Sequence, residues 1–427
     1  MEKNDHICVV GLGYVGLPLA VELSCYYDVT GYDIDAALIE RLKRGVNYNN
    51  DVDVGKLLEC AESLTSAEED IASCNIYIVA VPTPVDKDNV PDLSMLKSAT
   101  RMIARYLKKG DVVVYESTVY PGVTENVCGA ILQGISSLES GIDFFLGYSP
   151  ERINPGDREH TVKSVTKIVS AQTEEVADRL ASIYGSLNGG NIYKTKNIKT
   201  AEASKVVENA QRDINIAFIN EVTVLMNEMG ISIYDVLDAA RTKWNFLPFT
   251  PGLVSGHCIG VDPYYLIECA QKCGLNAEMV GAGRAINNRM SSYVSNIITE
   301  SLGGVAADGR GIRVLILGFT FKEEVNDIRN TKIFEVHNLL LASGFEVDIH
   351  DPYANAEEVR KAYGLELKEN LEGETYNCVA LLVSHKMYAD MDKKTQLALL
   401  KKGGVVFDLK GIWKNIEFPQ DTTYITL

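Results

Sequence analysis

A glycine pattern near the start of the chain constrains its fold more than any other feature. The motif G-x-G-x-x-G is matched by Gly11-Leu12-Gly13-Tyr14-Val15-Gly16, which follows the apolar segment Ile7–Val10 and opens a helical pattern. In a strand–turn–helix, such glycines permit a tight turn and let the backbone approach a pyrophosphate at the helix N-terminus. The alternative, a glycine-rich turn that binds no ligand, is disfavoured by this context.

A second predicted strand ends at Asp33, 17 residues after Gly16. A carboxylate at that place accepts hydrogen bonds from a ribose diol and repels a 2′-phosphate. The pattern therefore favours NAD over NADP as the cofactor. The later segment Leu315–Phe321 lacks the three glycines, so we expect no second dinucleotide site of this kind.

Short apolar segments alternate with helical patterns through about the first 195 residues, which predicts a parallel, doubly wound sheet. Helical patterns lie between the strands, for example at Tyr14–Cys25 and Ser94–Leu107. The predicted strands are His6–Val10, Val29–Asp33, Ile76–Val81, Val112–Glu116, Phe144–Tyr148 and Thr166–Ser170.

Strand patterns vanish between about Lys199 and Gly304, where Ala201–Gly230 has the apolar spacing of one long helix. A glycine-containing break near 307–311 then precedes a second βα series. The sequence thus predicts an α/β fold with two Rossmann-like doubly wound domains, joined by a long central helix and a helical middle domain. The expected bounds are 1–198, 199–305 and 306–427, and the later strands are expected at Arg313–Gly318, Glu346–His350, Cys378–Ser384 and Val405–Leu409.

The chain is acidic, with 41 basic and 58 acidic side chains and a formal charge of −17. Such a field repels polyphosphate, so we expect neither nucleic-acid binding nor binding to an anionic membrane. The 46% hydrophobic and 23% charged fractions are typical of a folded globular chain. No apolar run reaches the roughly 18–20 residues that span a bilayer, and the start has no signal-peptide pattern. Nine scattered cysteines, without a metal-ligand pattern, favour the reducing cytoplasm.

One cysteine stands out because glycines flank it in Gly256-His257-Cys258-Ile259-Gly260. A thiol in such a setting is open to close approach, although most cysteines are small buried hydrophobes. On the predicted long helix, Lys205, Asn209, Arg212 and Asp213 share one face. This stripe is either a solvated face or a source of oxyanion stabilisation. A thiol, a lysine and NAD together suit oxidation through a covalent thioester.

Three further segments follow predicted strands at the edge where open α/β sheets bind ligands. In the segment 148–157, Glu151 could serve as a general base and Arg152 could meet an anion, or the segment is a surface turn. The hydroxyls of Val81-Pro82-Thr83-Pro84 and Glu116-Ser117-Thr118 could contact a cofactor or only shape strand-end turns.

With these motifs in place, the chain resembles the UDP-glucose/GDP-mannose dehydrogenase family over nearly its whole length. Two of the motifs, SPERINPGD and GHCIGVDPYYL, are most similar to the branch that acts on UDP-N-acetylhexosamines. The motifs that carry the resemblance are GLGYVGLPLA at 11–20, VPTP at 81–84, EST at 116–118, SPERINPGD at 149–157, AEASKVVENA at 201–210, TKWNFLPFTPGLVSGHCIGVDPYYL at 242–266, LGFTFKEEVNDIR at 317–329 and DLKG at 408–411.

The resemblance implies a four-electron oxidation of the C6 hydroxyl of UDP-GlcNAc or UDP-GalNAc to a uronate, with two NAD, for a surface polysaccharide. It implies an NAD-binding N-terminal domain, a central helix that forms a homodimer interface and a C-terminal domain that binds the UDP-sugar. By the same resemblance, Cys258 traps the C6 aldehyde as a thiohemiacetal that becomes a thioester. Lys205 and Asn209 stabilise oxyanions, Glu151 assists hydrolysis, and Asp262 and Thr118 help to position water and protons.

The resemblance also implies ligand contacts and no metal. The implied cofactor contacts are Gly11, Gly13, Tyr14, Val15, Gly16, Asp33, Pro82, Thr83, Ser117, Thr118 and Arg329. The implied substrate contacts are Glu151, Arg152, Ile153, Lys205, Asn209, Arg212, Phe249, Gly252, Ser255, Phe321, Lys322 and Lys410.

Three positions depart from family patterns. Val261 stands where the UDP-glucose branch usually has a lysine, which weakens UDP-glucose as the substrate. Ser255 replaces a glycine of the hexosamine branch, and Leu38 replaces a basic cofactor-binding residue of some relatives. The remaining alternatives are a UDP-glucose 6-dehydrogenase, a UDP-ManNAc dehydrogenase and a non-catalytic regulator that binds NAD or a nucleotide sugar. The sequence does not identify the hexosamine epimer.

Overall fold

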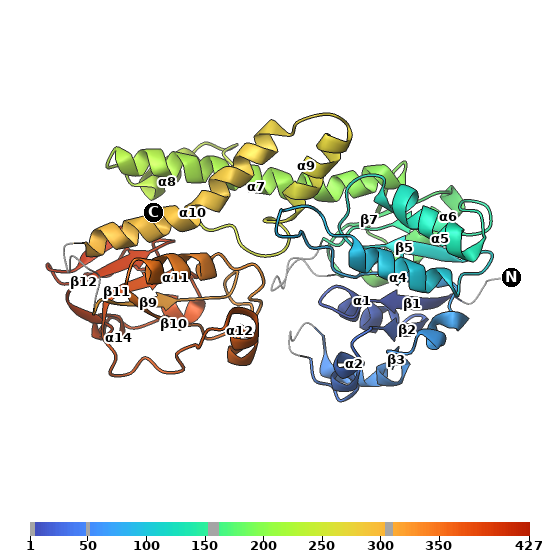
Figure 1. The fold of residues 1–427 in the computed structure, drawn as a ribbon, viewed down its shortest axis with the longest axis horizontal. Helices are drawn as coiled ribbons and strands as arrows, with labels where there is room; N and C mark the ends of the chain where they lie inside the picture. The colour runs from blue at the N-terminus through green and yellow to red at the C-terminus, as the bar shows by residue number, and fades with distance from the viewer. Residues whose placement is uncertain (1–4, 48–51, 153–161, 304–310) are drawn as a thin grey trace. The chain divides into compact units, whose positions relative to one another are not determined.

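The computed structural model describes residues 5–47, 52–152, 162–303 and 311–427 (Figure 1). The chain divides into two compact units, which are described separately. Unit 1 comprises residues 1–208 and 264–276, and unit 2 comprises residues 209–263 and 277–427. Two of the three boundaries fall inside helices, α7 (Ile198–Glu228) and α9 (Asp262–Lys272), and the third follows α9. The three-domain division remains a prediction.

Unit 1 is built on an eight-stranded sheet in the order β3-β2-β1-β4-β5-β6-β7-β8. The chain leaves β1 toward β2 and β3 and returns to pair β4 on the other side of β1, so the topological switch point lies between β1 and β4. Neighbouring strands are parallel except β6 and β7, which run antiparallel and depart from the fully parallel sheet that we expected. The strands are β1 (His6–Val10), β2 (Asp28–Tyr32), β3 (Leu64–Thr65), β4 (Ile76–Val79), β5 (Val112–Tyr115), β6 (Phe145–Tyr148), β7 (Lys167–Ala171) and β8 (Ile192–Lys194).

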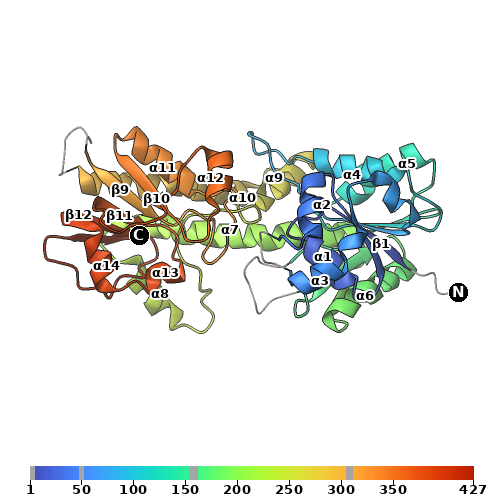
Figure 2. The same ribbon diagram turned by 90° about the horizontal axis from the view of Figure 1, so that it is seen from below.

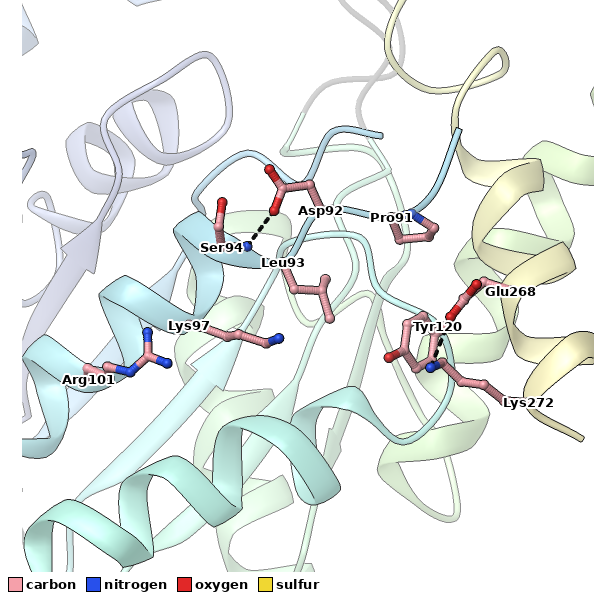
Figure 3. A pocket seen from close by; sticks show the side chains of 9 residues that line it. All are labelled: Pro91, Asp92, Leu93, Ser94, Lys97, Arg101, Tyr120, Glu268 and Lys272. Carbon is pink, nitrogen blue, oxygen red and sulfur yellow. Dashed lines mark hydrogen bonds and ion pairs between the residues drawn. The ribbon is translucent and has the colours of Figure 1, made fainter. Parts of the chain in front are cut away.

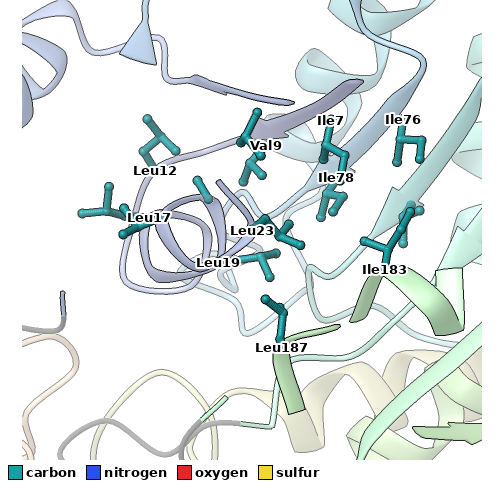
Figure 4. Packing of buried hydrophobic residues seen from close by; sticks show 14 of the residues in the cluster. Ile7, Val9, Leu12, Leu17, Leu19, Leu23, Ile76, Ile78, Ile183 and Leu187 are labelled. Carbon is teal, nitrogen blue, oxygen red and sulfur yellow. The ribbon is translucent and has the colours of Figure 1, made fainter. Parts of the chain in front are cut away.

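Helices cover both faces of this sheet, as a doubly wound fold requires (Figure 2). Helices α1 and α6 pack on one face, and Figure 4 shows their leucine and isoleucine side chains against those of β1 and β4. Helices α4 and α5 lie on the opposite face. The helices of unit 1 are α1 (Gly16–Leu23), α2 (Ala36–Lys43), α3 (Val54–Glu59), α4 (Ser94–Ala104), α5 (Ala130–Ser136) and α6 (Glu174–Asn188), with shorter turns at Ala61–Ser63, Glu68–Ser73 and Thr124–Gly129.

Unit 2 begins within the long helix α7, and the polar residues that share one face of this helix are partly buried and partly exposed. Asp213 is fully buried, and Arg284 and Asn287 of α10 donate to its Oδ1 at 2.6 and 2.7 Å. Arg212 on the same helix is exposed. The polar face of α7 is therefore in part buried in structural hydrogen bonds and in part exposed to solvent. Helix α10 spans Glu278–Leu302, and α8 spans Ile233–Arg241.

A five-stranded, fully parallel sheet forms the rest of unit 2, in the order β10-β9-β11-β12-β13. Its switch point lies between β9 and β11, since β10 pairs with one side of β9 and β11 with the other. The strands are β9 (Arg313–Leu317), β10 (Glu346–His350), β11 (Tyr376–Leu381), β12 (Leu400–Asp408) and β13 (Thr423–Thr426), and the helices are α11 (Ile333–Ala342), α12 (Ala356–Tyr363), α13 (Lys386–Ala389) and α14 (Lys393–Ala398). No described helix is long and apolar enough to cross a membrane.

A buried carboxylate, Asp351, joins the loops that follow β9, β10 and β11. Its Oδ2 accepts hydrogen bonds from the backbone N–H of Phe319 and Thr320 and lies 3.0 Å from Nε2 of His385. The backbone N–H of Glu324 donates to Nδ1 of the same imidazole, so the proton is on Nε2 and points at the carboxylate. Burial raises the pKa of Asp351, but His385 and the backbone donors outweigh it and lower that pKa to about 2.

Replacement of Asp351 by asparagine should therefore destabilise unit 2. The folded-state pKa lies below the ordinary value, so the carboxylate stabilises the fold above about pH 4, and this contribution is lost as the pH falls toward 2. We expect Asp351→Asn to lower the free energy of unfolding by about 2 kcal/mol at pH 7, measured by urea denaturation. The exposed Asp421→Asn is the control; equal losses from both variants would contradict the role of Asp351.

Candidate active site

The glycine loop of unit 1 lies at the switch point between β1 and β4. Gly11 has φ +94°, and a Cβ there would meet the carbonyl oxygen of Ala80, just after β4, at 3.0 Å. A Cβ on Gly16 would lie only 1.8 Å from the carbonyl oxygen of Gly11, so only glycine fits there. A Cβ on Gly13 would meet no described atom within 4 Å. The first and third glycines thus serve the turn, and the second leaves open space where a pyrophosphate would lie.

Asp33 is held rigidly beside this loop. Its Oδ2 accepts a hydrogen bond from the backbone N–H of Leu12 at 2.8 Å, and its Oδ1 accepts one from that of Asp35 at 2.9 Å. The N-cap residue of α1, Val15, makes no side-chain cap hydrogen bond. A helix end and an oriented carboxylate on either side of an open glycine fit the diphosphate and ribose of NAD.

The two loops after β4 and β5 are hydrogen-bonded to each other. The Thr83 hydroxyl donates to the carbonyl of Thr118 at 2.8 Å, and the Ser117 hydroxyl donates to the carbonyl of Val81 at 2.6 Å. Tyr265 of α9 donates its hydroxyl to the carbonyl of Thr83 at 2.8 Å. The structure thus brings the expected cofactor residues of these loops together, next to Pro82, which is exposed.

A buried ionic cluster follows, and sequence reasoning missed it. Glu116, at the end of β5, accepts a hydrogen bond from Tyr184 at 2.6 Å and pairs with Lys167 at 2.8 Å. Burial raises the pKa of Glu116, although Lys167 opposes this shift. Burial also disfavours the charged form of Lys167, but the two carboxylates, Glu116 and Glu151, outweigh it and raise its pKa. The lysine is therefore a fixed cation, and its Nζ lies 3.5 Å from Oε2 of Glu151.

Glu151 and Lys205, both expected to act in catalysis, are in contact within unit 1. The Lys205 ammonium donates to the backbone carbonyl of Glu151 at 2.6 Å. Arg152 pairs with Glu208 of α7 at 3.0 Å and donates to the carbonyl of Thr166 at 3.0 Å. The helix face that carries Lys205 thus meets the loop after β6. Ile153 lies outside the described residues.

A second missed carboxylate, Glu202, lies one turn before Lys205 on α7. It is fully buried, and it accepts hydrogen bonds from the backbone N–H of Gly122 at 2.5 Å and of Thr124 at 2.8 Å. Burial raises the pKa of Glu202, and the backbone and hydroxyl donors that bind it only partly offset this shift. Glu202 thereby fixes the chain that follows Thr118 to the helix that carries Lys205.

In unit 2, the Cys258 loop leads directly into α9. The backbone carbonyl of Cys258 accepts the N–H of Asp262 at 2.8 Å, and that of Val261 at 3.0 Å. The Asn209 amide donates to Oδ2 of Asp262 at 2.5 Å, and both side chains are buried. The structure therefore brings Asn209 and Asp262 together and ties them to the loop that carries the partly buried thiol. Lys205 and Cys258 belong to different units.

The loop after β9 packs against the chain beside Cys258. A Cβ on Gly256 would lie 2.9 Å from the Phe321 ring, and the His257 ring meets that ring edge-on, with centroids 6.1 Å apart. Nδ1 of His257 lies 3.7 Å from Asp327. Asp327 also binds Arg329, the expected cofactor contact. Burial raises the pKa of Asp327, but the hydrogen bonds and charge of Arg329 outweigh it and lower that pKa.

Lys410 lies beside Gly252, and both residues are expected substrate contacts. Its Nζ is 3.4 Å from both the Thr250 hydroxyl and the Pro251 carbonyl, and a Cβ on Gly252 would meet that nitrogen at 3.3 Å. Burial lowers the pKa of Lys410. A half-buried cation whose charged form is disfavoured by burial suits an anionic ligand.

Three further expected substrate contacts are Phe249, Lys322 and Ser255. Phe249 packs on a small apolar cluster, and Lys322 is half-buried after β9. Ser255, which replaces the usual glycine, accepts the backbone N–H of Lys332 at 2.9 Å and so has a local structural role. Among the described residues, no group of three or more His, Cys, Asp or Glu side chains could hold a metal ion.

Comparison with known proteins identifies the family of the chain. Three models of the UDP-glucose/GDP-mannose dehydrogenase family match the chain: the NAD binding domain at residues 5–188, the central domain at 199–289 and the UDP binding domain at 315–415. The chain belongs to this family. It is therefore an NAD-dependent oxidoreductase, and NAD is its cofactor. The expected α/β fold with two sheets and a helical middle is confirmed.

The relatives cover nearly the whole chain. The UDP-N-acetyl-D-glucosamine 6-dehydrogenase of Pseudomonas aeruginosa is 45% identical over 409 residues, which are 96% of this chain and 97% of that protein. The enzyme of the same name from Salmonella typhi is 44% identical over 405 residues, 95% of each chain. Among solved structures, UDP-D-ManNAc dehydrogenase from Pyrococcus horikoshii aligns with a TM-score of 0.88 at 29% identity and covers 99% of this chain and 98% of that one.

The glycine loop yields a matched pair of variants. Gly16→Ala should disrupt the turn and unfold unit 1 at a lower temperature, because its Cβ overlaps a backbone oxygen. Gly13→Ala should leave the melting temperature within about 2 °C and raise the KM for NAD at least tenfold, because its methyl occupies the open space. Thermal unfolding and steady-state kinetics measure the two effects. A Gly13→Ala enzyme with unchanged KM would contradict this assignment.

Proposed function

We propose that the enzyme oxidises the C6 hydroxyl of a UDP-N-acetylhexosamine, UDP-GlcNAc or UDP-GalNAc, to the uronate. The support is the 45% identity, over nearly the full length of both chains, to an enzyme named for UDP-N-acetyl-D-glucosamine. The observation that carries the chemistry is the buried Asn209–Asp262 pair beside Cys258, with Lys205 one helical turn before Asn209. A binding protein would need neither the thiol nor this polar setting. A surface polysaccharide is the proposed destination of the product.

The reaction proceeds through the thiol of Cys258. NAD, when bound, accepts a hydride in each of the two oxidations. After the first, the Cys258 thiol adds to the C6 aldehyde and forms a thiohemiacetal, which keeps the reactive aldehyde on the protein. The second oxidation gives a thioester. Water then cleaves the carbon–sulfur bond, which yields the carboxylate and returns the thiol.

The neighbouring side chains stabilise charge and place water. The Lys205 ammonium and the Asn209 amide are donors for the oxyanions of the thiohemiacetal and of the hydrolysis step. Asp262 accepts the Asn209 hydrogen bond and so orients that amide. Glu151 assists the attack of water, and its Oε2 lies 3.5 Å from Nζ of Lys167. Thr118, whose carbonyl is bonded to Thr83, positions water beside the cofactor.

The proposed substrate contacts are a set that follows strands of the second sheet and a set elsewhere in the chain. In unit 2, Lys410, Lys322 and Phe321 follow strands of the second sheet, where open α/β sheets bind ligands. The half-buried Lys410 gains most from a diphosphate, because a bound anion reverses the depression of its pKa. The remaining proposed contacts are Arg152, Ile153, Arg212, Phe249, Gly252 and Ser255.

We also propose a homodimer through α7 and a cytoplasmic location. Phe218 and Leu225 of α7, and Met229 directly after it, are all more than half exposed, at helical spacing that places them along one side. Covering such a stripe with a second copy removes apolar surface from water. Sedimentation at micromolar concentration should give the dimer mass, and a monomer would contradict this interface. All nine cysteines lie in the described residues and form no disulfide, which supports a reducing compartment.

A substrate panel tests the proposed activity. NADH release should be fastest with UDP-GlcNAc or UDP-GalNAc, and kcat/KM for UDP-glucose should be at least tenfold lower, since Val261 replaces the lysine of that branch. UDP-ManNAc completes the panel, because a structural relative is named for it. A preference for UDP-glucose or UDP-ManNAc would overturn the substrate. Binding of these sugars without NADH release would overturn the activity and favour a regulator.

A further inference from the structure

One pocket of unit 1 is lined by none of the site residues named above. It has a volume of about 440 Å³ and opens between the start of α4 and the last turns of α9 (Figure 3). This volume falls within the roughly 300–1,000 Å³ that small-molecule sites occupy. Its lining residues are Pro91, Asp92, Leu93, Ser94, Lys97, Arg101, Tyr120, Glu268 and Lys272.

Three cations line this pocket, although the chain as a whole is strongly acidic. Lys97 and Arg101 are one turn apart on α4, and Lys97 extends toward Tyr120 in Figure 3. Lys272 approaches from α9, where its Nζ lies 2.9 Å from Glu268 and 5.3 Å from the centre of the Tyr120 ring. Glu268 is thus neutralised by Lys272.

The other carboxylate, Asp92, is already used by the backbone. Its Oδ1 accepts the N–H of Ser94 at 2.8 Å, at the first turn of α4. Within the described part of the chain, Lys97 and Arg101 make no ion pair. The five charged side chains of the lining sum to +1, and the positive end of the eleven-residue α4 adds to this field. Leu93, Pro91 and Tyr120 supply apolar surface.

We propose that this pocket binds a small multivalent oxyanion, a phosphorylated or polycarboxylate metabolite, with Lys97 and Arg101 as its principal ligands. Lys272 and the Tyr120 hydroxyl complete the donor set. The site differs from the NAD and UDP-sugar sites, since it contains none of their residues. The inference does not depend on which sugar the enzyme oxidises.

The position of the pocket links it to the cofactor loops. Tyr265, Glu268 and Lys272 share one face of α9, at i, i+3 and i+7. Tyr265 bonds the Thr83 carbonyl, and its ring lies 6.4 Å from that of Tyr120. An anion that draws in Lys272 therefore acts on the helix that supports the loop after β4.

Calorimetric titration tests the site. The wild-type enzyme is first saturated with UDP and NADH, which fill the nucleotide sites, and is then titrated with inorganic pyrophosphate or, separately, with citrate in low salt. One site per chain is expected for at least one probe, and the comparison of probes shows whether phosphate or carboxylate oxygens are preferred. Added sodium chloride should weaken binding.

Variants locate the binding. Lys97→Gln/Arg101→Gln should weaken it at least tenfold, and Lys97→Glu should abolish it; thermal unfolding confirms that each variant folds. Lys43→Ala/Arg44→Ala removes the same two charges from the exposed end of α2 and should change the Kd less than twofold. The proposal is overturned if neither probe binds, if the Lys97 and Arg101 variants bind as tightly as the wild type, or if the control weakens binding equally.

Discussion

The hydrogen bond between Asn209 and Asp262 is the contact on which the proposed catalytic end of unit 2 depends. It joins the long helix α7 to the first residue of α9, at 2.5 Å and with both side chains buried. The Cys258 carbonyl accepts the N–H of Asp262, the first residue of that helix, so the bond also fixes the thiol loop. Loss of either partner would leave a buried polar group unsatisfied, at a cost of about 1–3 kcal/mol. The proposed nucleophile is thus held by regular helices rather than by a free loop.

Carboxylates that accept backbone N–H groups recur at the loops around both sheets. Each carboxylate fixes the chain segments whose backbone N–H groups it binds. Those N–H groups therefore have hydrogen-bond partners. Part of the acidic excess of the chain is therefore structural rather than a solvated coat. The carboxylates that act in this way are Asp33, Glu202, Asp351 and Asp408.

Ligand preference follows from placed cations and not from the net charge of −17. The charge argues against polyanionic surfaces, yet the enzyme binds NAD, which carries a diphosphate. The candidate sites offer local compensation: the start of α1 beside Gly13 for the diphosphate of NAD, and the half-buried Lys410 for the proposed UDP-sugar. Lys167 shows the same principle inside the protein, where one cation offsets the charge of two buried or half-buried carboxylates.

The elements with strong local patterns were predictable from sequence. The bounds of β1 and β10 match the expected strands because each is an apolar or alternating run between turns. Short edge strands, β3 and β8 among them, carry too few apolar residues to be recognised. The strand β7 was expected at Thr166–Ser170, but no local signal shows that it runs antiparallel to β6.

Side-chain networks were the harder part, since their partners are far apart in sequence. Glu116 and Lys167 are 51 residues apart, and Asp213 and Arg284 are 71 apart. No spacing rule joins such pairs. The candidate site was predictable where a motif carries its own chemistry, as with Gly11–Gly16 and Cys258, and the family resemblance supplied the remaining residues.

The most direct test of the central claim is a single-turnover reaction of UDP-GlcNAc with excess NAD, quenched in acid and analysed by mass spectrometry. The account predicts two NADH per sugar and a transient sugar-nucleotide adduct on the peptide that contains Cys258. It also predicts that Cys258→Ala binds NAD normally and forms no uronate. Full uronate production by Cys258→Ala would contradict the covalent mechanism.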